Sequence, residues 1–120
     1  MRDEFSALDF SVCESMLNTN LLSHIAIIKA CLPHMTTQKN GMIVNISSGS
    51  GIFGMPLRTM YSATKFGLSG FGKALRSEVK HLGIKVIQVY PGYVKTNISL
   101  NAMTGKGDKF GKVDSNINKG

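Results

Sequence analysis

The segment MIVNISSGSGIFGMPLRTMYSATK, residues 42–65, joins a short apolar run to the start of a helix through a glycine-rich connection. Met42 to Ile46 contains β-branched residues and is predicted to form a buried parallel strand. Ser47 to Leu57 contains three glycines and a proline, which predicts a loop. From about Thr59 a helix with an apolar stripe is predicted, and Gly83 is expected to end it.

Upstream of this segment the sequence predicts a second long helix. Apolar residues recur at alternating steps of four and three, which indicates an amphipathic helix over about Val12 to Gln38. Ser11 and Glu14 have the spacing of a capping box at its start. Pro33 is expected to bend or weaken its last turn, and Asn40-Gly41 is expected to stop it.

Downstream, Ile84 to Tyr90 is predicted to form a second buried strand, closed by Pro91-Gly92. The order of long helix, strand, long helix and strand predicts an α/β fold, as a fragment of a doubly wound Rossmann-type parallel sheet. The second helix contains Gly67, Gly70 and Gly72, each of which costs about 1 kcal/mol relative to Ala. These glycines suggest that another backbone or a ligand packs closely against that helix.

The composition suits a single domain and does not indicate a nucleic-acid-binding surface. The 120 residues are 42% hydrophobic, and the net charge of +7 comes from lysines and arginines that are scattered singly. We therefore interpret the charge as a solvated surface and rank nucleic-acid binding last among the candidate functions. Cys13 and Cys31 are predicted to lie roughly 27 Å apart on one helix, so they cannot bridge each other, which is typical of an intracellular protein.

The end of the chain and its histidines indicate no further site. After Thr96 the composition shifts to Asn, Gly, Lys, Ser and Asp, which predicts a flexible loop over residues 97–120. His24, His34 and His81 show no paired ligand spacing, so no metal site is expected. The sequence contains no apolar run long enough to span a bilayer.

Three side chains around the glycine-rich loop carry the functional prediction. Tyr61 and Lys65 are four residues apart on the predicted helix, so they lie on one helical face. The positive charge of Lys65 would favour the deprotonated form of Tyr61 and make it a proton donor and acceptor suited to working pH. Ser48, thirteen residues before Tyr61, adds a hydroxyl group at the start of the loop.

The motifs Asn45-Ile-Ser-Ser48, Tyr61-Ser-Ala-Thr-Lys65 and Pro91-Gly92, in this order, resemble those of the short-chain dehydrogenase/reductase superfamily over nearly the whole chain. Within it, Leu32 to Met35 and especially Pro91 to Asn97 are similar to the dehydrogenase/reductase member seven-B branch. The resemblance implies that residues 1–120 are the central and C-terminal part of one NAD(P)-binding Rossmann-type domain, with residues 97–120 as its substrate loop. It also implies an oxidoreductase that interconverts a carbonyl and an alcohol.

The resemblance assigns catalytic roles to four residues. Tyr61 would protonate the carbonyl oxygen as hydride arrives, or take the proton back in oxidation. Lys65 would act on Tyr61 and hydrogen-bond the nicotinamide ribose, and Ser48 would orient and polarise the carbonyl. Asn20 falls where the family's helix asparagine holds a water that links the lysine to solvent, with Asn18 as a nearby alternative.

The resemblance also implies contacts with a cofactor, for which NADP(H) is expected rather than NAD(H). Open parallel sheets place such ligands at the carboxyl ends of their strands. The backbone after the last strand would meet the nicotinamide carboxamide, and glycine at position 92 would permit a close approach. The predicted cofactor-binding residues are Ile46, Ser47, Tyr61, Lys65, Pro91, Gly92, Val94 and Thr96.

A departure from the family leaves a second function open. The strand and glycine-rich turn that seat the pyrophosphate in the family have no counterpart in this sequence. The alternative is a catalytically inactive fragment that acts as a dimerisation or interaction module. The expected partners are a small, lipid-like carbonyl or alcohol substrate and a second copy of the chain, bound through the two long helices. The expected location is intracellular, in the cytoplasm, or on an endoplasmic reticulum or peroxisome membrane where the parent protein carries an N-terminal anchor.

Overall fold

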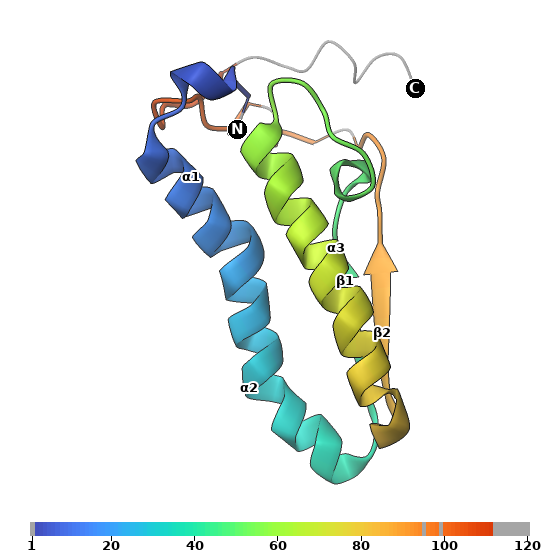
Figure 1. Cartoon of the computed structure of the whole chain (residues 1–120). Coiled ribbons are helices and arrows are strands. Elements are labelled where there is room, and N and C mark those ends of the chain that lie inside the picture. Colours follow the sequence, from blue (N-terminus) through green and yellow to red (C-terminus); the bar gives the residue numbers. More distant parts are fainter. Residues whose placement is uncertain (1, 95, 99, 112–120) are drawn as a thin grey trace.

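The computed structural model describes residues 2–94, 96–98 and 100–111 of the chain, which form a layer of helices on a pair of strands (Figure 1). Helix α1, Phe10–Leu17, continues through a π-helical turn at Asn18–Leu22 into α2, Ser23–Gln38. Strand β1, Gly41–Ile46, is followed by α3, Thr59–Val79, and by β2, Ile84–Val89. The predicted order of helix, strand, helix and strand is therefore confirmed, and so is the α/β fold class.

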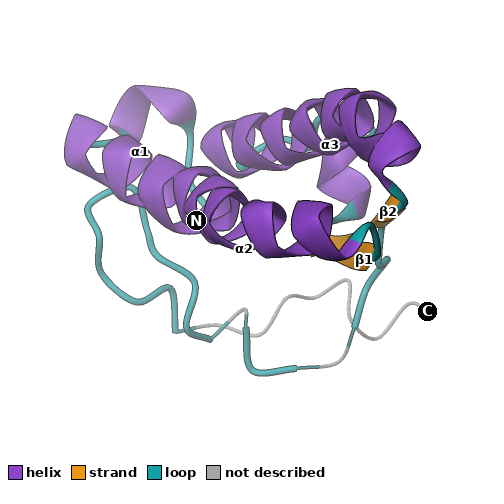
Figure 2. Cartoon of the chain, turned by 90° about the horizontal axis from the view of Figure 1, so that it is seen from below, coloured by secondary structure: helices purple, strands orange, loops and turns teal. Residues whose placement is uncertain are grey.

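The two strands are parallel and hydrogen-bonded to each other, with Gly41 opposite Ile84 and Ile46 opposite Val89. Both long helices lie on the same side of this pair (Figure 2). Side chains alternate between the two faces of a strand, so Ile43 is buried under the helices whereas its neighbours Met42 and Val44 are exposed. The prediction of fully buried strands holds for one face only, because the described residues contain no helix on the other side.

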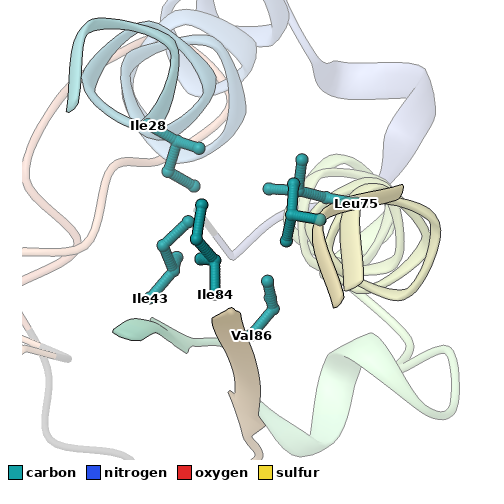
Figure 3. Packing of buried hydrophobic residues seen from close by; sticks show 6 residues of the cluster. Ile28, Ile43, Leu75, Ile84 and Val86 are labelled. Atoms are coloured by element: carbon teal, nitrogen blue, oxygen red, sulfur yellow. The ribbon is translucent and has the colours of Figure 1, made fainter. Parts of the chain in front are cut away.

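The hydrophobic core lies between the helices and the first half of the strands (Figure 3). It joins all four long elements, and each of its side chains stabilises the fold by roughly 1.5–3 kcal/mol through removal from water. The buried cluster contains Ile28 of α2, Ile43 of β1, Leu75 and Val79 of α3, and Ile84 and Val86 of β2. Because the core occupies the amino-terminal half of the sheet, the carboxyl ends of both strands are left for polar groups.

The first helix starts and stops differently from the prediction. It begins at Phe10 with Asp9 as its N-cap and no capping side chain, so the predicted capping box at Ser11 is wrong. It ends at Gln38, and the C-cap Lys39 adopts a left-handed conformation with φ of 50°. Gly41 does not end the helix, because it already belongs to β1. Glycine is needed there for another reason, since a Cβ would lie 2.7 Å from the Met35 side chain.

The irregular part of the first helix also lies elsewhere than expected. Pro33 is accommodated inside α2, which continues for five more residues to Gln38. The departure from α-helical geometry is the π-helical turn at Asn18–Leu22, between α1 and α2. A π-helical turn holds one extra residue in a helical turn and is frequently found at functional sites.

The second helix ends as predicted, through a short 3-10 turn and Gly83, whose φ is 76°. Its internal glycines differ in their surroundings. The expectation of close packing is met at Gly67, against the Leu21 side chain, and at Gly72, against the Gln88 side chain, although the neighbour is a side chain and not the backbone or ligand that was suggested. It is wrong for Gly70, where a Cβ would meet no atom within 4 Å.

The segment that follows β2 returns to the N-terminal end of the chain (Figure 1). An antiparallel bridge pairs Met103 with Lys109, and Gly105 accepts a hydrogen bond from the Asp9 backbone and donates one to the Asp3 carboxylate. Part of the predicted substrate loop, residues 112–120, lies outside the described residues. The described part contributes to the cavity at the carboxyl ends of the strands.

Two glycine substitutions should separate a required glycine from a dispensable one. Gly83→Ala should lower the free energy of unfolding by at least about 1–2 kcal/mol, because its positive φ strains any other residue and its Cβ would meet the Lys39 carbonyl. Gly70→Ala should raise it by up to about 1 kcal/mol through helix propensity alone. Urea unfolding of both variants measures this, and equal effects would contradict the packing described.

Candidate active site

A cavity of about 360 Å³ lies at the carboxyl ends of β1 and β2, where open parallel sheets bind their ligands. Its wall comes from the loop after β1, the first turn of α3, the segment after β2 and the turn around residues 98–110. Seven of the predicted site residues line this one cavity: Ser47, Ser48, Tyr61, Pro91, Gly92, Val94 and Thr96. The topology therefore brings together residues that are up to 49 positions apart in the sequence.

Ser48 begins the 3-10 turn Gly49–Gly51 in an extended conformation. Its Oγ accepts a hydrogen bond of 3.2 Å from the backbone N–H of Ser50. This bond uses a lone pair of the hydroxyl oxygen, so the hydroxyl hydrogen can still be donated to a ligand. Ser48 is therefore oriented by the backbone and remains able to donate into the cavity.

Tyr61 lies in the first turn of α3, and Lys65 lies on the same helical face one turn later. The Nζ atom of Lys65 is 5.8 Å from the centroid of the Tyr61 ring. The same ammonium donates a hydrogen bond of 3.3 Å to the carbonyl oxygen of Ile46 at the end of β1. The predicted pairing of Tyr61 and Lys65 on one face is therefore present, with the ammonium also tied to the strand.

Burial lowers the pKa of Lys65 from its ordinary value of 10.5, because partial desolvation disfavours the charged ammonium. Within the described residues, neither Lys65 nor Ile46 lines the cavity. Lys65 thus stands beside Tyr61 without being part of the cavity wall. From this position it can act on Tyr61 through its charge.

Asn20 belongs to the π-helical turn and reaches α3 rather than the cavity. Its Nδ2 lies 3.5 Å from Oγ1 of Thr64, which is fully buried and directly precedes Lys65. The neighbouring Asn18 is exposed, so it is the Asn20 amide that meets the helix of Tyr61 and Lys65. The structure therefore places the predicted asparagine next to the lysine region, outside the cavity itself.

Two of the residues expected to face a cofactor, Gly92 and Thr96, have an accessible backbone or an available hydroxyl group. A Cβ at Gly92 would meet no atom within 4 Å, so the backbone there can be approached closely. Thr96 Oγ1 accepts a hydrogen bond of 3.3 Å from the Ile98 N–H and keeps its own hydrogen for donation. A flat ring that carries an amide fits such an arrangement, since an amide needs both donors and acceptors.

Sequence reasoning missed the apolar wall of the cavity. Phe53 and Met55 come from the glycine-rich loop, and Phe110 comes from the segment predicted to be flexible. No periodic pattern marks a loop residue as part of a wall, because its neighbours in space are distant in sequence. Two arginines, Arg2 and Arg58, also line the cavity, and the Arg2 guanidinium lies 5.4 Å from the centre of the Phe110 ring.

Comparison with known proteins shows the family of this chain. Residues 1–106 match the family described as short chain dehydrogenase. The chain therefore belongs to the short-chain dehydrogenase/reductase family, an oxidoreductase family, and the resemblance predicted from its motifs is confirmed.

The relatives include members of the predicted branch. A dehydrogenase/reductase SDR family protein 7-like from Anopheles gambiae is 43% identical over 92% of this chain and 34% of its own length. Dehydrogenase/reductase SDR family member 7B from Xenopus tropicalis is 42% identical over 92% of this chain and 36% of its own length. The chain thus spans about a third of the length of the curated relatives that it matches.

Solved structures of similar fold confirm the Rossmann-type architecture. The structure titled ElxO with NADP bound has a TM-score of 0.78 and 34% identity, over 82% of this chain and 40% of that chain. A short-chain dehydrogenase from Streptomyces avermitilis has a TM-score of 0.77 and 31% identity, over 81% of this chain and 36% of that chain.

Two features are absent from the residues that the structure describes. None of their helices combines the length and the apolar character needed to cross a membrane. The same residues contain no group of three or more His, Cys, Asp or Glu side chains arranged to hold a metal ion.

The lowered pKa of Lys65 predicts how stability should depend on pH. Between the lowered pKa of Lys65 in the folded state and 10.5, the unfolded state binds more protons than the folded state, so stability rises with pH over this range. The cost of burying the charge is therefore present at neutral pH and is relieved as the pH rises towards 10.5. Lys65→Met should therefore have a Tm equal to or above that of the unsubstituted protein at neutral pH, and the difference should shrink in alkaline solution. Thermal unfolding followed by circular dichroism tests this. A clearly lower Tm for Lys65→Met at neutral pH would show that the bond to Ile46 outweighs desolvation.

Proposed function

We propose that this chain carries the catalytic centre of an NAD(P)(H)-dependent oxidoreductase that interconverts a carbonyl and an alcohol. The observation that carries the proposal is that the Ser48 and Tyr61 side chains line one cavity at the strand ends, with the Lys65 ammonium beside the Tyr61 ring. In this proposal residues 1–120 are the central and C-terminal part of one NAD(P)-binding domain. Membership of an oxidoreductase family supports an enzyme over the alternative of an inactive module.

The proposed chemistry is a proton transfer by Tyr61 that accompanies hydride transfer. When bound, a reduced nicotinamide would supply the hydride that the carbonyl carbon accepts. Tyr61 donates its phenolic proton to the carbonyl oxygen, while Ser48 donates a hydrogen bond to the same oxygen as negative charge develops on it. The nearby Lys65 ammonium stabilises the tyrosinate that remains. In oxidation the same groups act in the reverse direction.

Asn20 is proposed to support the return of the proton to Tyr61. In this role its side chain holds a water molecule that connects Lys65 with solvent. Support comes from its position, because its amide lies against Thr64, the residue before Lys65. The π-helical turn gives a reason for this position, since the extra residue in the turn changes the direction of the side chains that follow it.

The cofactor is proposed to bind with its nicotinamide end in the cavity. Backbone groups of Pro91, Gly92 and Val94 and the Thr96 hydroxyl would hold the carboxamide, and Ile46 and Ser47 would line the cofactor through their backbone. Tyr61 and Lys65 would hydrogen-bond the ribose. We favour NADP(H) over NAD(H) because the structurally similar ElxO was solved with NADP bound.

The substrate is proposed to be an apolar, lipid-like carbonyl compound or the corresponding alcohol. Support comes from the cavity lining, which includes seven apolar or aromatic side chains besides Tyr61 and Pro91. These are Phe53, Met55, Tyr93, Val94, Ile98, Ala102 and Phe110. An intracellular location, in the cytoplasm or on an organelle membrane, stays a prediction from the sequence.

Substitution of the proposed proton donor tests the function. In the complete gene product, Tyr61→Phe should lower kcat about 10²–10⁴-fold with an apolar ketone and NADPH, because the phenolic proton is removed while the ring is kept. The measurement is the loss of reduced-nicotinamide absorbance, run in parallel with NADH. Tyr90→Phe deletes a phenolic hydroxyl at a residue that does not line the cavity and should retain full activity. Unchanged turnover of Tyr61→Phe would exclude Tyr61 as the acid.

A homodimer through the two long helices is proposed as the assembly. Family members commonly oligomerise, and the helices expose large apolar side chains, with Leu22 at 52%, Ile27 at 64% and Phe66 at 44% exposure. Apolar surface of this kind is typical of an interaction site. The dimer is compatible with the proposed enzyme, because these side chains do not line the cavity.

A charge placed on α3 tests this interface. Phe66→Glu should raise the dissociation constant of the dimer about ten- to a hundredfold, because it places a charge on exposed aromatic surface that the proposed dimer would bury. Phe5→Glu is the matched control, since Phe5 is 64% exposed but lies outside both long helices. Sedimentation velocity gives the populations. A monomeric unsubstituted protein, or equal effects of the two substitutions, would contradict the proposed interface.

A further inference from the structure

The loop after Ser48 contains three hydrogen bonds that connect Ser48 step by step to Ser62, the residue after Tyr61. The Ser50 N–H donates to Ser48 Oγ at 3.2 Å, and the Ser50 hydroxyl donates to the sulfur of Met55 at 3.1 Å. The Met55 N–H then donates to Oγ of Ser62 at 3.3 Å, and Ser62 directly follows Tyr61 in the first turn of α3. These three bonds, through Ser50, Met55 and Ser62, are the loop bridge.

The loop bridge is built from buried hydroxyl groups. Ser50 is 1% exposed and Ser62 is 7% exposed. A buried hydroxyl group needs a hydrogen-bond partner, and the loss of that partner leaves the hydroxyl unpaired at a cost of about 1–3 kcal/mol. Although a thioether is a weak acceptor, the Met55 sulfur therefore restrains Ser50 and the turn that carries it.

The turn that contains Ser50 is also pressed against α3. A Cβ on Gly51 would lie 2.6 Å from Ser47 Oγ and 2.9 Å from the carbonyl oxygen of Lys65. Such contacts leave no room for the turn to move towards the helix. The loop bridge restrains the same turn through the bond from the Ser50 hydroxyl to the Met55 sulfur.

We propose that Ser50 and Met55 are positioning residues that hold the Ser48 hydroxyl in a fixed place relative to the Tyr61 hydroxyl. The inference rests on the proposed function, because it concerns the two hydroxyl groups assigned to the carbonyl oxygen. Both groups must reach one oxygen atom, and a displacement of about 1 Å from productive geometry can cost about 10²-fold in rate. Ser50 acts through Ser48, and Met55 acts through Ser50.

A role through Ser48 can be separated from a role in folding by combining substitutions. In the complete gene product, Ser50→Ala should lower kcat about three- to tenfold and leave the KM for NADPH within about twofold, because only the geometry of the reacting oxygen changes. When Ser48→Ala is already present, adding Ser50→Ala should change kcat by less than about 1.5-fold, since the group that it positions is gone.

The control for the loss of a buried hydroxyl is Ser69→Ala. Ser69 is 3% exposed, lies on α3, and donates its hydroxyl to the Lys65 carbonyl within the helix. Ser69→Ala should lower the Tm, as Ser50→Ala should. Any effect of Ser69→Ala on kcat should be the same whether or not the Ser48 hydroxyl is present. This comparison removes the general effect of a weakened fold.

A second cycle tests the contact between Ser50 and Met55. Met55→Leu keeps an apolar side chain on the cavity wall and removes the sulfur acceptor. Met55→Leu should lower kcat by about the same factor as Ser50→Ala. Because both substitutions remove the same hydrogen bond, the double variant should lose only about that one factor in kcat. Should Ser50→Ala fail to fold, Ser50→Cys, which keeps a weak donor, takes its place in both cycles.

Two outcomes would overturn the inference. One is an equal loss of kcat from Ser50→Ala with and without the Ser48 hydroxyl, and the other is additive losses from Ser50→Ala and Met55→Leu. If Ser48→Ala leaves no measurable turnover, the combination of Ser50→Ala with Met55→Leu decides whether the positioning role is correct. Failure of the proposed function is recognised separately, because it would appear as unchanged turnover of Tyr61→Phe. If Tyr61→Phe is inactive and the losses of kcat from Ser50→Ala and Met55→Leu are additive, only the positioning role is refuted.

Discussion

The parallel pairing of β1 and β2 is the constraint on which the site depends. The ladder runs without interruption from Gly41 opposite Ile84 to Ile46 opposite Val89, so both strands end at the same level. The loop after β1 and the segment after β2 are thereby held next to each other, and the Gly49 N–H donates to the Pro91 carbonyl at 3.2 Å between them. The core beneath, at the other half of the strands, stabilises this pairing without occupying the cavity.

The first turns of α3 supply the remaining groups, and they do so at some cost to stability. Lys65 is partly desolvated beside Tyr61, which lowers its pKa, and its ammonium is tied to the Ile46 carbonyl at the end of β1. The same helix approaches the turn after Ser48 so closely that only glycine fits at position 51.

Most of the fold could be predicted from local patterns, and the departures have physical reasons. The strands and the second helix lie where apolar periodicity and the positive-φ glycine at position 83 indicated. The capping box at Ser11 was wrong because the helix begins two residues earlier than predicted, at Phe10, with Asp9 as N-cap. The π-helical turn at Asn18–Leu22 could not be predicted, because its sequence carries no breaker signal and its geometry is set by packing on α3.

The sequence by itself determined the chemical groups of the site and their local spacing. A helical repeat of 3.6 residues is enough to put Tyr61 and Lys65 on one face, and the motifs around them were enough to recognise the family. Only the tertiary structure decided which groups share a cavity and which face of the sheet is covered. It also decided that Met55 connects the turn after Ser48 to the first turn of α3, through its sulfur and its backbone N–H. The reason is that local spacing follows from backbone geometry, whereas contacts between distant segments follow from how the helices pack on the paired strands.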